Sequence, residues 1–507
     1  MQHALQSERT ELKSAEGNFR RPQGSRWADR AILLLLVIIA LAMPFSNRLA
    51  VHAFRLAVLI WAVKLITYRP KLRPQPLALP LLLFLVLTAI SSALSYEPQL
   101  SWGRMRTVSL LLLVPLITQS LTSLKQVRVL VSALVISTLL LVAYTGWQYT
   151  FGIGVALKRL APESSLARAG WLPGDTITMV NGHRLYSPSS LRHIVKDGPP
   201  TEVLRITMRR NAPPEWHELQ YDRATLLEAG LLERGALARA HPVRAQGVFK
   251  HYVPFSEFLM IMGAICFGMV ASDKEKLKIL FAIAFLAISA ALVATVTRAT
   301  LAALAVACLL VLWLKARWPA RALSSLLVLS VLVLGSFWFQ RERGTGWYEA
   351  RDAGSQYREL MWKDGLRLAA QHPWFGVGMD SIHRHWQEWN IRAYQRFPHL
   401  KSHFHSTYIQ LAAECGLAVL AVWLWFLAAY LAMLWKLIPR TDPGRPRFEN
   451  GFVLGLLAAT VAFIATGAVH YTLGDAEVMI VFWFLAGLST SVLIAQSPAN
   501  LTPTNRT

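Results

Sequence analysis

The stretch Ala31-Ile-Leu-Leu-Leu-Leu-Val-Ile-Ile-Ala-Leu-Ala-Met-Pro-Phe45 is apolar throughout and follows a basic segment. Similar runs recur, and with their flanks most approach the ~20 residues that an α-helix needs to cross a bilayer. Hydropathy identifies about twelve, at Ala31–Phe45, Leu49–Tyr68, Leu77–Leu94, Ser109–Leu121, Val129–Tyr144, Phe255–Ala271, Ile279–Val296, Leu301–Leu314, Leu323–Phe337, Tyr408–Trp435, Phe452–Val469 and Val478–Ile494. Only 16% of the 507 residues are charged, against roughly a quarter in a soluble protein. The sequence therefore predicts an all-α polytopic membrane protein.

Basic residues in the short loops predict the orientation of these helices. If the runs cross the membrane alternately, the polar N-terminal tail and every basic short loop fall on one side. That side is cytoplasmic by the positive-inside rule, although Arg104 and Arg106 lie on the other side. Both termini are then cytoplasmic, and the two long loops lie outside. The tail lacks the pattern of a cleavable signal, so we expect the first run to be retained.

This orientation predicts an alternation of membrane segments and loops. The expected parts are a cytoplasmic tail at 1–30, helices one to five at 31–151, an outer loop at 152–251, helices six to nine at 252–339, a second, helical outer loop at 340–405, helices ten to twelve at 406–495, and a cytoplasmic tail at 496–507.

The net charge indicates which ligands suit the protein, and the positions of the cysteines bear on disulfides and zinc binding. The net charge of +23 exceeds what the cytoplasmic loops explain, because the outer loops are basic too. Beside a membrane, the polyanions that suit such a surface are lipid phosphates, whereas no nucleic-acid-binding motif accompanies the charge. The three cysteines, Cys266, Cys308 and Cys415, lie in separate apolar runs, so we expect neither a disulfide framework nor a zinc site.

The first outer loop has the pattern of a small α+β domain. The turn signals Gly174-Asp175 and Asn181-Gly182 bracket a short strand. A helical stretch follows at Ser190–Val195, and Val203–Arg209 alternates as a strand does. This order predicts an insert of compact secondary structure within the loop.

The insert resembles a PDZ domain in its bacterial form over about residues 160–222, through the run Ala-Gly170…Pro-Gly-Asp-Thr-Ile…Val-Asn-Gly182. In that family a peptide adds as a strand to a sheet edge. The only candidate for a carboxylate-binding loop, Phe151-Gly-Ile-Gly154, abuts the fifth apolar run. A rigid lid or spacer is the alternative interpretation, and the partner of the insert stays open.

The second outer loop carries the residues that can do chemistry. A helical pattern from Tyr357 to Ala370 ends at a proline and paired glycines, and the segment His403-Phe-His405-Ser406 then meets the tenth apolar run. Imidazole can take up a proton near neutral pH, and a titratable group at a membrane boundary is a candidate functional residue. Five histidines lie between His383 and His405 with one carboxylate and no cysteine, so we predict no metal site.

Four landmarks, in order, resemble the O-antigen ligase and polymerase (Wzy-C-like) superfamily of integral membrane glycosyltransferases, and O-antigen ligase most of all. They are Arg244-Ala-Gln-Gly247-Val-Phe249, Thr297-Arg298-Ala-Thr, Arg358 with Trp362 and then His372-Pro-Trp-Phe-Gly376-Val-Gly378, and His405-Ser406 with Gly416 after nine residues. The likeness covers nearly the whole chain outside the insert. The departures are the insert itself and Ser406, where asparagine is common in the superfamily.

The resemblance implies an inverting, metal-independent transferase without a cofactor, in the inner membrane of a bacterium with its site facing the periplasm. Its donor would be a glycan on undecaprenyl diphosphate, and its acceptor a sugar hydroxyl of the lipid A core. His405 would accept the proton of that hydroxyl. Arg298 and Arg358, with Arg244 in reserve, would bind the diphosphate, because arginine forks suit phosphate oxygens. The supporting residues are His403, Ser406, Gly376, Gly378 and Gly416.

Several alternatives remain open at this stage. His405 could be an interfacial histidine at a helix start, because Thr407 and Gln410 form a capping-box pattern, and Arg298 could anchor a helix end to lipid head groups. Within the same chemistry, the chain could be an O-antigen polymerase or a protein O-oligosaccharyltransferase. A transporter of lipid-linked glycans would show internal repeats and broken spans. A PDZ-bearing envelope sensor would leave the histidine and arginine landmarks unexplained.

Overall fold

The computed structural model describes residues 23–160, 162–211, 214–229, 233, 235–241, 244–272, 277–315, 353–398, 402–438 and 448–496. The chain forms two compact units. The helical unit comprises Met1–Thr138, Glu257–Ser289 and Arg298–Thr507, and the insert unit comprises Leu139–Ser256 and Ala290–Thr297.

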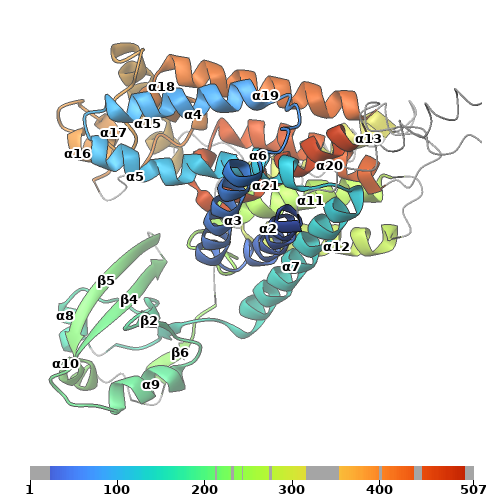
Figure 1. Ribbon diagram of the computed structural model, residues 1–507. Coiled ribbons are helices and arrows are strands. Elements are labelled where there is room, and N and C mark those ends of the chain that lie inside the picture. The colour runs from blue at the N-terminus through green and yellow to red at the C-terminus, as the bar shows by residue number, and fades with distance from the viewer. Residues whose placement is uncertain are drawn as a thin grey trace, which may run out of the picture. The chain divides into compact units, whose positions relative to one another are not determined.

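Helices account for most of the described chain, as the apolar runs predict (Figure 1). Outside the sheet of the insert, they are α2 (Gln23–Ala42), α3 (Asn47–Tyr68), α4 (Ala78–Ala93), α5 (Pro98–Val108), η1 (Ser109–Leu112), α6 (Leu113–Ser120), α7 (Leu124–Phe151), α11 (Tyr252–Val270), α12 (Lys278–Ala294), α13 (Arg298–Lys315), α15 (Ala353–Gln371), α16 (Ile382–His385), α17 (Arg392–Arg396), α18 (Thr407–Cys415), α19 (Leu417–Leu437), α20 (Phe448–Gly467), η2 (Thr472–Gly474) and α21 (Ala476–Ala495).

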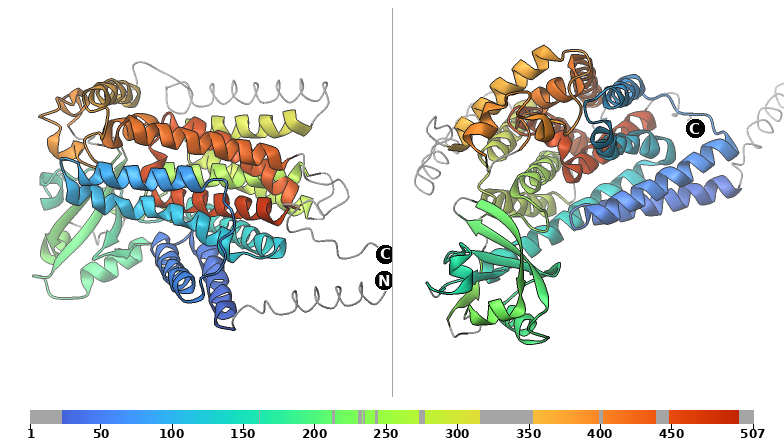
Figure 2. Two further views of the ribbon diagram at one scale, coloured as in Figure 1. Left: turned by 45° about the horizontal axis from the view of Figure 1, so that its top comes forward. Right: turned by 90° about the vertical axis from the view of Figure 1, so that its left-hand side faces the viewer.

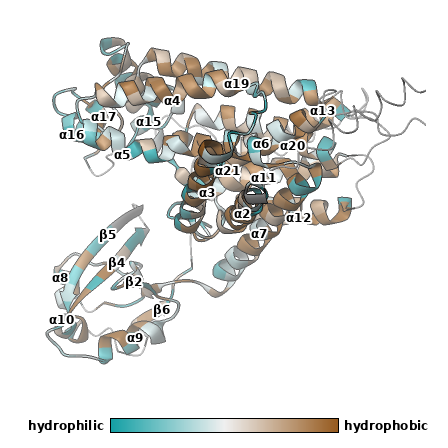
Figure 3. Ribbon diagram, in the orientation of Figure 1, coloured by the Kyte–Doolittle hydropathy of each residue, from teal (hydrophilic) through white to brown (hydrophobic). Residues whose placement is uncertain are grey.

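Within the described residues, eight helical segments are long and apolar enough to cross a membrane, and α4 and α12 are shorter apolar helices. Figure 3 shows apolar residues along α3, α12 and α19. On α3 the side chains of Leu59 and Ile66 are 60% and 75% exposed, as expected where lipid replaces protein contacts. The protein is therefore a multi-pass membrane protein. The predicted number of about twelve helices stays a prediction, and the run Leu323–Phe337 lies outside the described residues.

The tenth apolar run, predicted as one helix over Tyr408–Trp435, is broken in two. Helix α18 ends at Cys415 and α19 begins at Leu417, because Gly416 between them has φ 89° and ψ 166°. Only glycine adopts this conformation at little cost. A Cβ atom at this position would also lie 2.2 Å from the carbonyl oxygen of Trp374. The glycine of the His-Ser…Gly pattern therefore ends a short helix that begins directly after Ser406.

Helices α11 and α20 approach each other through glycines. A Cβ added at Gly268 of α11 would lie 2.3 Å from the Cα of Gly455, and Gly451 faces the same contact from one turn earlier on α20. Glycines four residues apart let helix backbones pack closely within a membrane. This contact places α11, which begins at Tyr252, beside the helix that leads into the last described loop.

The insert unit contains an antiparallel sheet of β1 (Val155–Leu157), β2 (Thr176–Val180), β3 (His183–Arg184), β4 (Val203–Asn211), β5 (Pro214–Asp222) and β6 (Leu237–Arg239). Its order is β5-β4-β2-β1-β6, with β3 paired to β2. The short helices are α8 (Ser165–Arg168), α9 (Pro188–Lys196) and α10 (Arg223–Glu228).

Local sequence signals of the insert are confirmed. Val180 pairs with His183, so Asn181 and Gly182 form a two-residue hairpin loop, and their φ values of 50° and 79° are those of a type I′ turn. The predicted helix and second strand correspond to α9 and β4. Buried residues from most elements form one core, including Trp171, Ile177, Val180, Leu191, Leu204 and Ile206. The resemblance to a PDZ domain itself stays a prediction.

The sheet extends beyond the predicted range of 160–222 at both ends. Strand β1 precedes that range, and β6 follows it and pairs antiparallel with β1, with Ala156 opposite Ala238. Two further bonds continue the pairing, because the Lys158 N–H donates to the carbonyl of Ala236 and the Ala240 N–H donates to that of Gly154. The chain itself therefore covers this edge of β1, where an added peptide strand would otherwise pair.

Candidate functional site

His405 lies two residues before the first residue of α18. This helix lies at one end of the helical unit, where α15, α16, α17 and α18 gather (Figures 1 and 2). Ser406 is the N-cap residue, and its Oγ accepts a bond of 3.5 Å from the N–H of Ile409. Since backbone N–H groups at a helix start carry partial positive charge, His405 lies at the positive end of α18.

The backbone at His405 is held in an uncommon conformation. Its φ of 51° lies in the left-handed region, which few residues other than glycine adopt. Its N–H donates to Nδ1 of His403 at 3.0 Å, and Nε1 of Trp362 donates to its carbonyl at 3.4 Å. Residues in such conformations persist where their surroundings hold them, often at functional sites. His403 therefore contacts the predicted base directly.

Helix α15 places an aromatic side chain, that of Tyr357, beside His405. The ring centroid of Tyr357 lies 5.7 Å from that of His405 in an edge-on arrangement, and the ring of His403 lies 4.4 Å away. Burial raises the pKa of the Tyr357 hydroxyl, so this phenol stays protonated. Helix α15 packs closely on α18, because Gly365 faces Phe404 and Ile409 with no room for a side chain.

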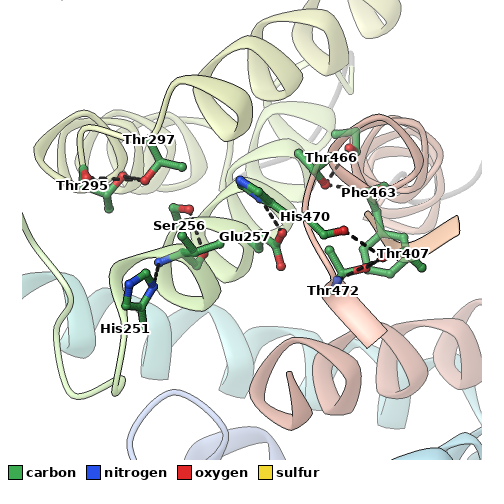
Figure 4. Close-up of polar contacts among 12 residues, drawn as sticks. His251, Ser256, Glu257, Thr295, Thr297, Thr407, Phe463, Thr466, His470 and Thr472 are labelled. Carbon is green, nitrogen blue, oxygen red and sulfur yellow. Dashed lines mark hydrogen bonds and ion pairs between the residues drawn. The ribbon is translucent and has the colours of Figure 1, made fainter. Parts of the chain in front are cut away.

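A second loop, between α20 and α21, completes the start of α18. The carbonyl of His470 accepts a 2.9 Å bond from the Thr407 N–H and a 3.0 Å bond from the Thr407 hydroxyl (Figure 4). The Thr472 N–H donates to the same hydroxyl oxygen at 3.0 Å. The predicted capping box of Thr407 and Gln410 is therefore wrong, since Thr407 bonds across the fold and Gln410 Oε1 instead accepts from the Phe404 N–H.

The three predicted glycines have one shared structural role. The Val377 and Gly378 N–H groups donate to the carbonyls of Ala413 and Glu414 at 2.9 and 2.8 Å, and so satisfy the C-terminal end of α18. A Cβ at Gly376 would lie 2.3 Å from the carbonyl carbon of Glu414. Gly376, Gly378 and Gly416 thus permit close backbone contact between two segments and position α18.

The three predicted arginines lie in different segments of the chain. Arg358 follows Tyr357 on α15, and its charge helps to lower the pKa of His470 to about 3, after burial as the larger cause. Arg298 is the first residue of α13 and is half-buried. Arg244 belongs to the insert unit, where its guanidinium lies 4.2 Å from the ring centroid of Tyr252. The diphosphate-binding roles of all three arginines stay predictions.

Two histidines between α15 and α18, His383 and His385, bond to protein groups. His385 contacts Glu97 and Glu388 at 3.2 and 2.9 Å, and His383 Nδ1 lies 3.1 Å from the hydroxyl of Tyr394. Within the described residues, no group of three His, Cys, Asp or Glu side chains could hold a metal ion. His383 and His385 therefore join α16 to neighbouring segments.

A cluster of charged residues lies beside α18. Asp380 forms an ion pair with Arg104, and its N–H donates to Oε1 of the buried Glu414 at 2.9 Å. Arg104 and Tyr471 line a cavity of about 30 Å³ whose other walls are largely apolar, enough room for a water molecule. This cluster ties α5 and α18 to the segment after Gly378.

The fold and this site define a multi-pass membrane protein with a polar site built around the start of a short helix. Residues 283–424 match the family model Wzy_C, described as O-antigen ligase, which confirms the predicted resemblance to the O-antigen ligase superfamily. The match includes the landmarks at Arg298, Arg358 and His405, but not the one at Arg244. Members of this family are glycosyltransferase-like enzymes. No curated protein matches the chain.

Three buried polar residues near the site, Glu257, His470 and Glu414, are not among the residues predicted from the sequence. Glu257 and Glu414 are carboxylates inside predicted apolar runs, and an ionisable residue in such a run is a functional candidate by default. That signal was present and could have identified both. His470 lies outside the matched segment and carries no motif, so only the fold shows its contact with Thr407.

Proposed function

We propose that the protein is an O-antigen ligase. It transfers a polysaccharide from undecaprenyl diphosphate to a sugar hydroxyl of the lipid A core, with inversion at the anomeric carbon and without a metal ion. The observation that carries the proposal is the placement of His405 at the start of α18, beside Tyr357 on the helix that also carries Arg358.

The chemistry follows from the roles of these side chains. The imidazole of His405 accepts the proton of the attacking hydroxyl, which forms a bond to the anomeric carbon as the bond to the diphosphate breaks. The leaving diphosphate gains negative charge, and the guanidinium of Arg358 stabilises it. Arg298 is the second phosphate ligand that we propose, because the N–H groups at the start of α13 favour an anion at the same place.

The break at Gly416 bears on the alternative of a lipid-linked glycan transporter. In transporters, broken helices expose backbone carbonyls to coordinate ions. Here the carbonyls of Ala413 and Glu414, just before the break, accept from the N–H groups of Val377 and Gly378. The N–H of Leu417, just after the break, donates to the carbonyl of Pro373. Because these carbonyls already accept hydrogen bonds, they are not left to coordinate an ion. The break therefore supports a role in positioning α18 and does not support a transporter.

The test is lipopolysaccharide profiling in a strain that lacks the gene and carries either the wild type or His405→Ala. We expect full-length O-antigen on lipid A with the wild type and none with the variant. The matched control is His193→Ala, since the side chain of His193 is 82% exposed on the insert and should be dispensable. Full-length O-antigen with His405→Ala contradicts the proposal. Single repeats on the core, without long chains, would instead identify a polymerase.

A further inference from the structure

Glu257 is a carboxylate in the apolar helix α11, and its side chain is fully buried. Its Oε1 lies 2.9 Å from Nδ1 of His470, whose side chain is 6% exposed (Figure 4). Removing two ionisable groups from water costs several kcal/mol unless they pair well. A buried carboxylate in a helix that otherwise needs only apolar residues, paired with a buried histidine from a distant loop, indicates a role beyond packing.

The pair connects to the proposed base through one residue. The carbonyl of His470 accepts both the N–H and the hydroxyl of Thr407, at 2.9 and 3.0 Å. Thr407 is the first residue of α18 and lies two positions after His405. A continuous set of hydrogen bonds therefore runs from Glu257 through His470 to the segment that carries His405.

The same imidazole also lies within electrostatic reach of Arg358. Burial and the charge of Arg358 lower the pKa of His470 to about 3, so the ring is neutral at physiological pH. Glu257 and His470 are both too buried to contact a glycan substrate. They can act on the reaction only by holding other residues in place.

We propose that Glu257 and His470 are positioning residues, which hold the start of α18 and with it His405. This inference rests on the proposed glycan transfer, because it assigns the two residues to that same site. A base and a phosphate ligand must both meet one substrate, and a displacement of about 1 Å costs on the order of 10²-fold in rate.

The kinetic test compares purified full-length variants in transfer from a lipid-diphosphate-linked glycan to lipid A core. We expect Glu257→Gln and His470→Gln to lower kcat about 10- to 100-fold with little change in KM for the donor. The matched control is Glu449→Gln, because the side chain of Glu449 is 5% exposed and pairs with Arg128. A wild-type kcat in both test variants, or an equal loss of kcat in Glu449→Gln, overturns the proposal.

Hydrogen–deuterium exchange supplies a measurement that needs no activity. Because the Thr407 N–H bonds to the carbonyl of His470, we expect Glu257→Ala to speed exchange in the peptide over residues 403–411, whereas Glu449→Ala leaves it unchanged. Unchanged exchange in Glu257→Ala overturns the inference. If the wild type transfers no glycan at all, the proposed function fails, and faster exchange in Glu257→Ala would still show that this pair holds the start of α18.

Discussion

The insert and the site around His405 are built in opposite ways. In the insert, strands and turns follow one another along the chain, and the buried core comes from residues between Val155 and Leu237. At the site, the bond between Glu257 and His470 joins residues 213 positions apart. The insert therefore follows from local patterns, whereas the site exists only where the ends of several helices meet.

The largest effect is expected at His405 itself. Replacing it with alanine removes the proposed general base, and we expect the rate of glycan transfer to fall by about 10²–10⁴-fold. The measurement is a transfer assay with purified protein, with His193→Ala of the insert as its control. If His405→Ala keeps activity within a few-fold of the wild type, as expected for His193→Ala, the site around His405 is no more important for transfer than the insert.

The second-largest effect on the transfer rate is expected at Arg358. Arg358→Ala is expected to lower kcat by about 10²-fold, because one donor to the developing charge is lost. Arg358→Lys should lower it less, since a point charge replaces the guanidinium fork. The transfer assay checks both variants. If lysine and alanine give the same rate, a diphosphate role for this side chain is wrong.

Glycines in the two regions should differ in their sensitivity to alanine. Gly416 and Gly170 both have positive φ, but a Cβ meets the Trp374 carbonyl at 2.2 Å in the first case and open space in the second. We expect Gly416→Ala to destabilise the protein by about 2–5 kcal/mol, and Gly170→Ala by about 1–2 kcal/mol. Thermal unfolding in detergent measures both changes, and equal shifts in Tm would contradict the close contact at Gly416.

The smallest effect is expected from closing the edge of the insert covalently. Ala156 and Ala238 are paired across β1 and β6, so cysteines at both positions should form a disulfide under oxidising conditions. We expect the cross-linked protein to keep transfer activity within about twofold, because the link adds no change to a pairing that already exists. Non-reducing electrophoresis detects the cross-link. If the disulfide does not form, β6 does not stay paired with β1.

Much of the fold could be predicted because apolar runs and turn signals act locally. The run Phe452–Val469 became α20, and Asn181-Gly182 became a two-residue turn, since hydropathy and backbone preference operate within one segment. The single helix predicted over Tyr408–Trp435 was wrong. Its break depends on the approach of Trp374 to Gly416, a contact between distant segments that hydropathy does not register.

The candidate site was predicted in part. His405 at a helix start was accessible because a motif and a change from polar to apolar sequence mark it. The capping box of Thr407 and Gln410 was wrong because the hydroxyl of Thr407 found a partner on another loop. His470 had no local signal at all.

By itself, the sequence determined that this is a multi-pass membrane protein that resembles the O-antigen ligase superfamily, and it identified His405 as the candidate base. Hydropathy and short motifs suffice for this, because each depends on residues that are near one another in the chain. Only the tertiary structure decided what holds His405 in place. Glu257, Tyr357 and His470 come from separate helices and loops, and packing alone brings them together.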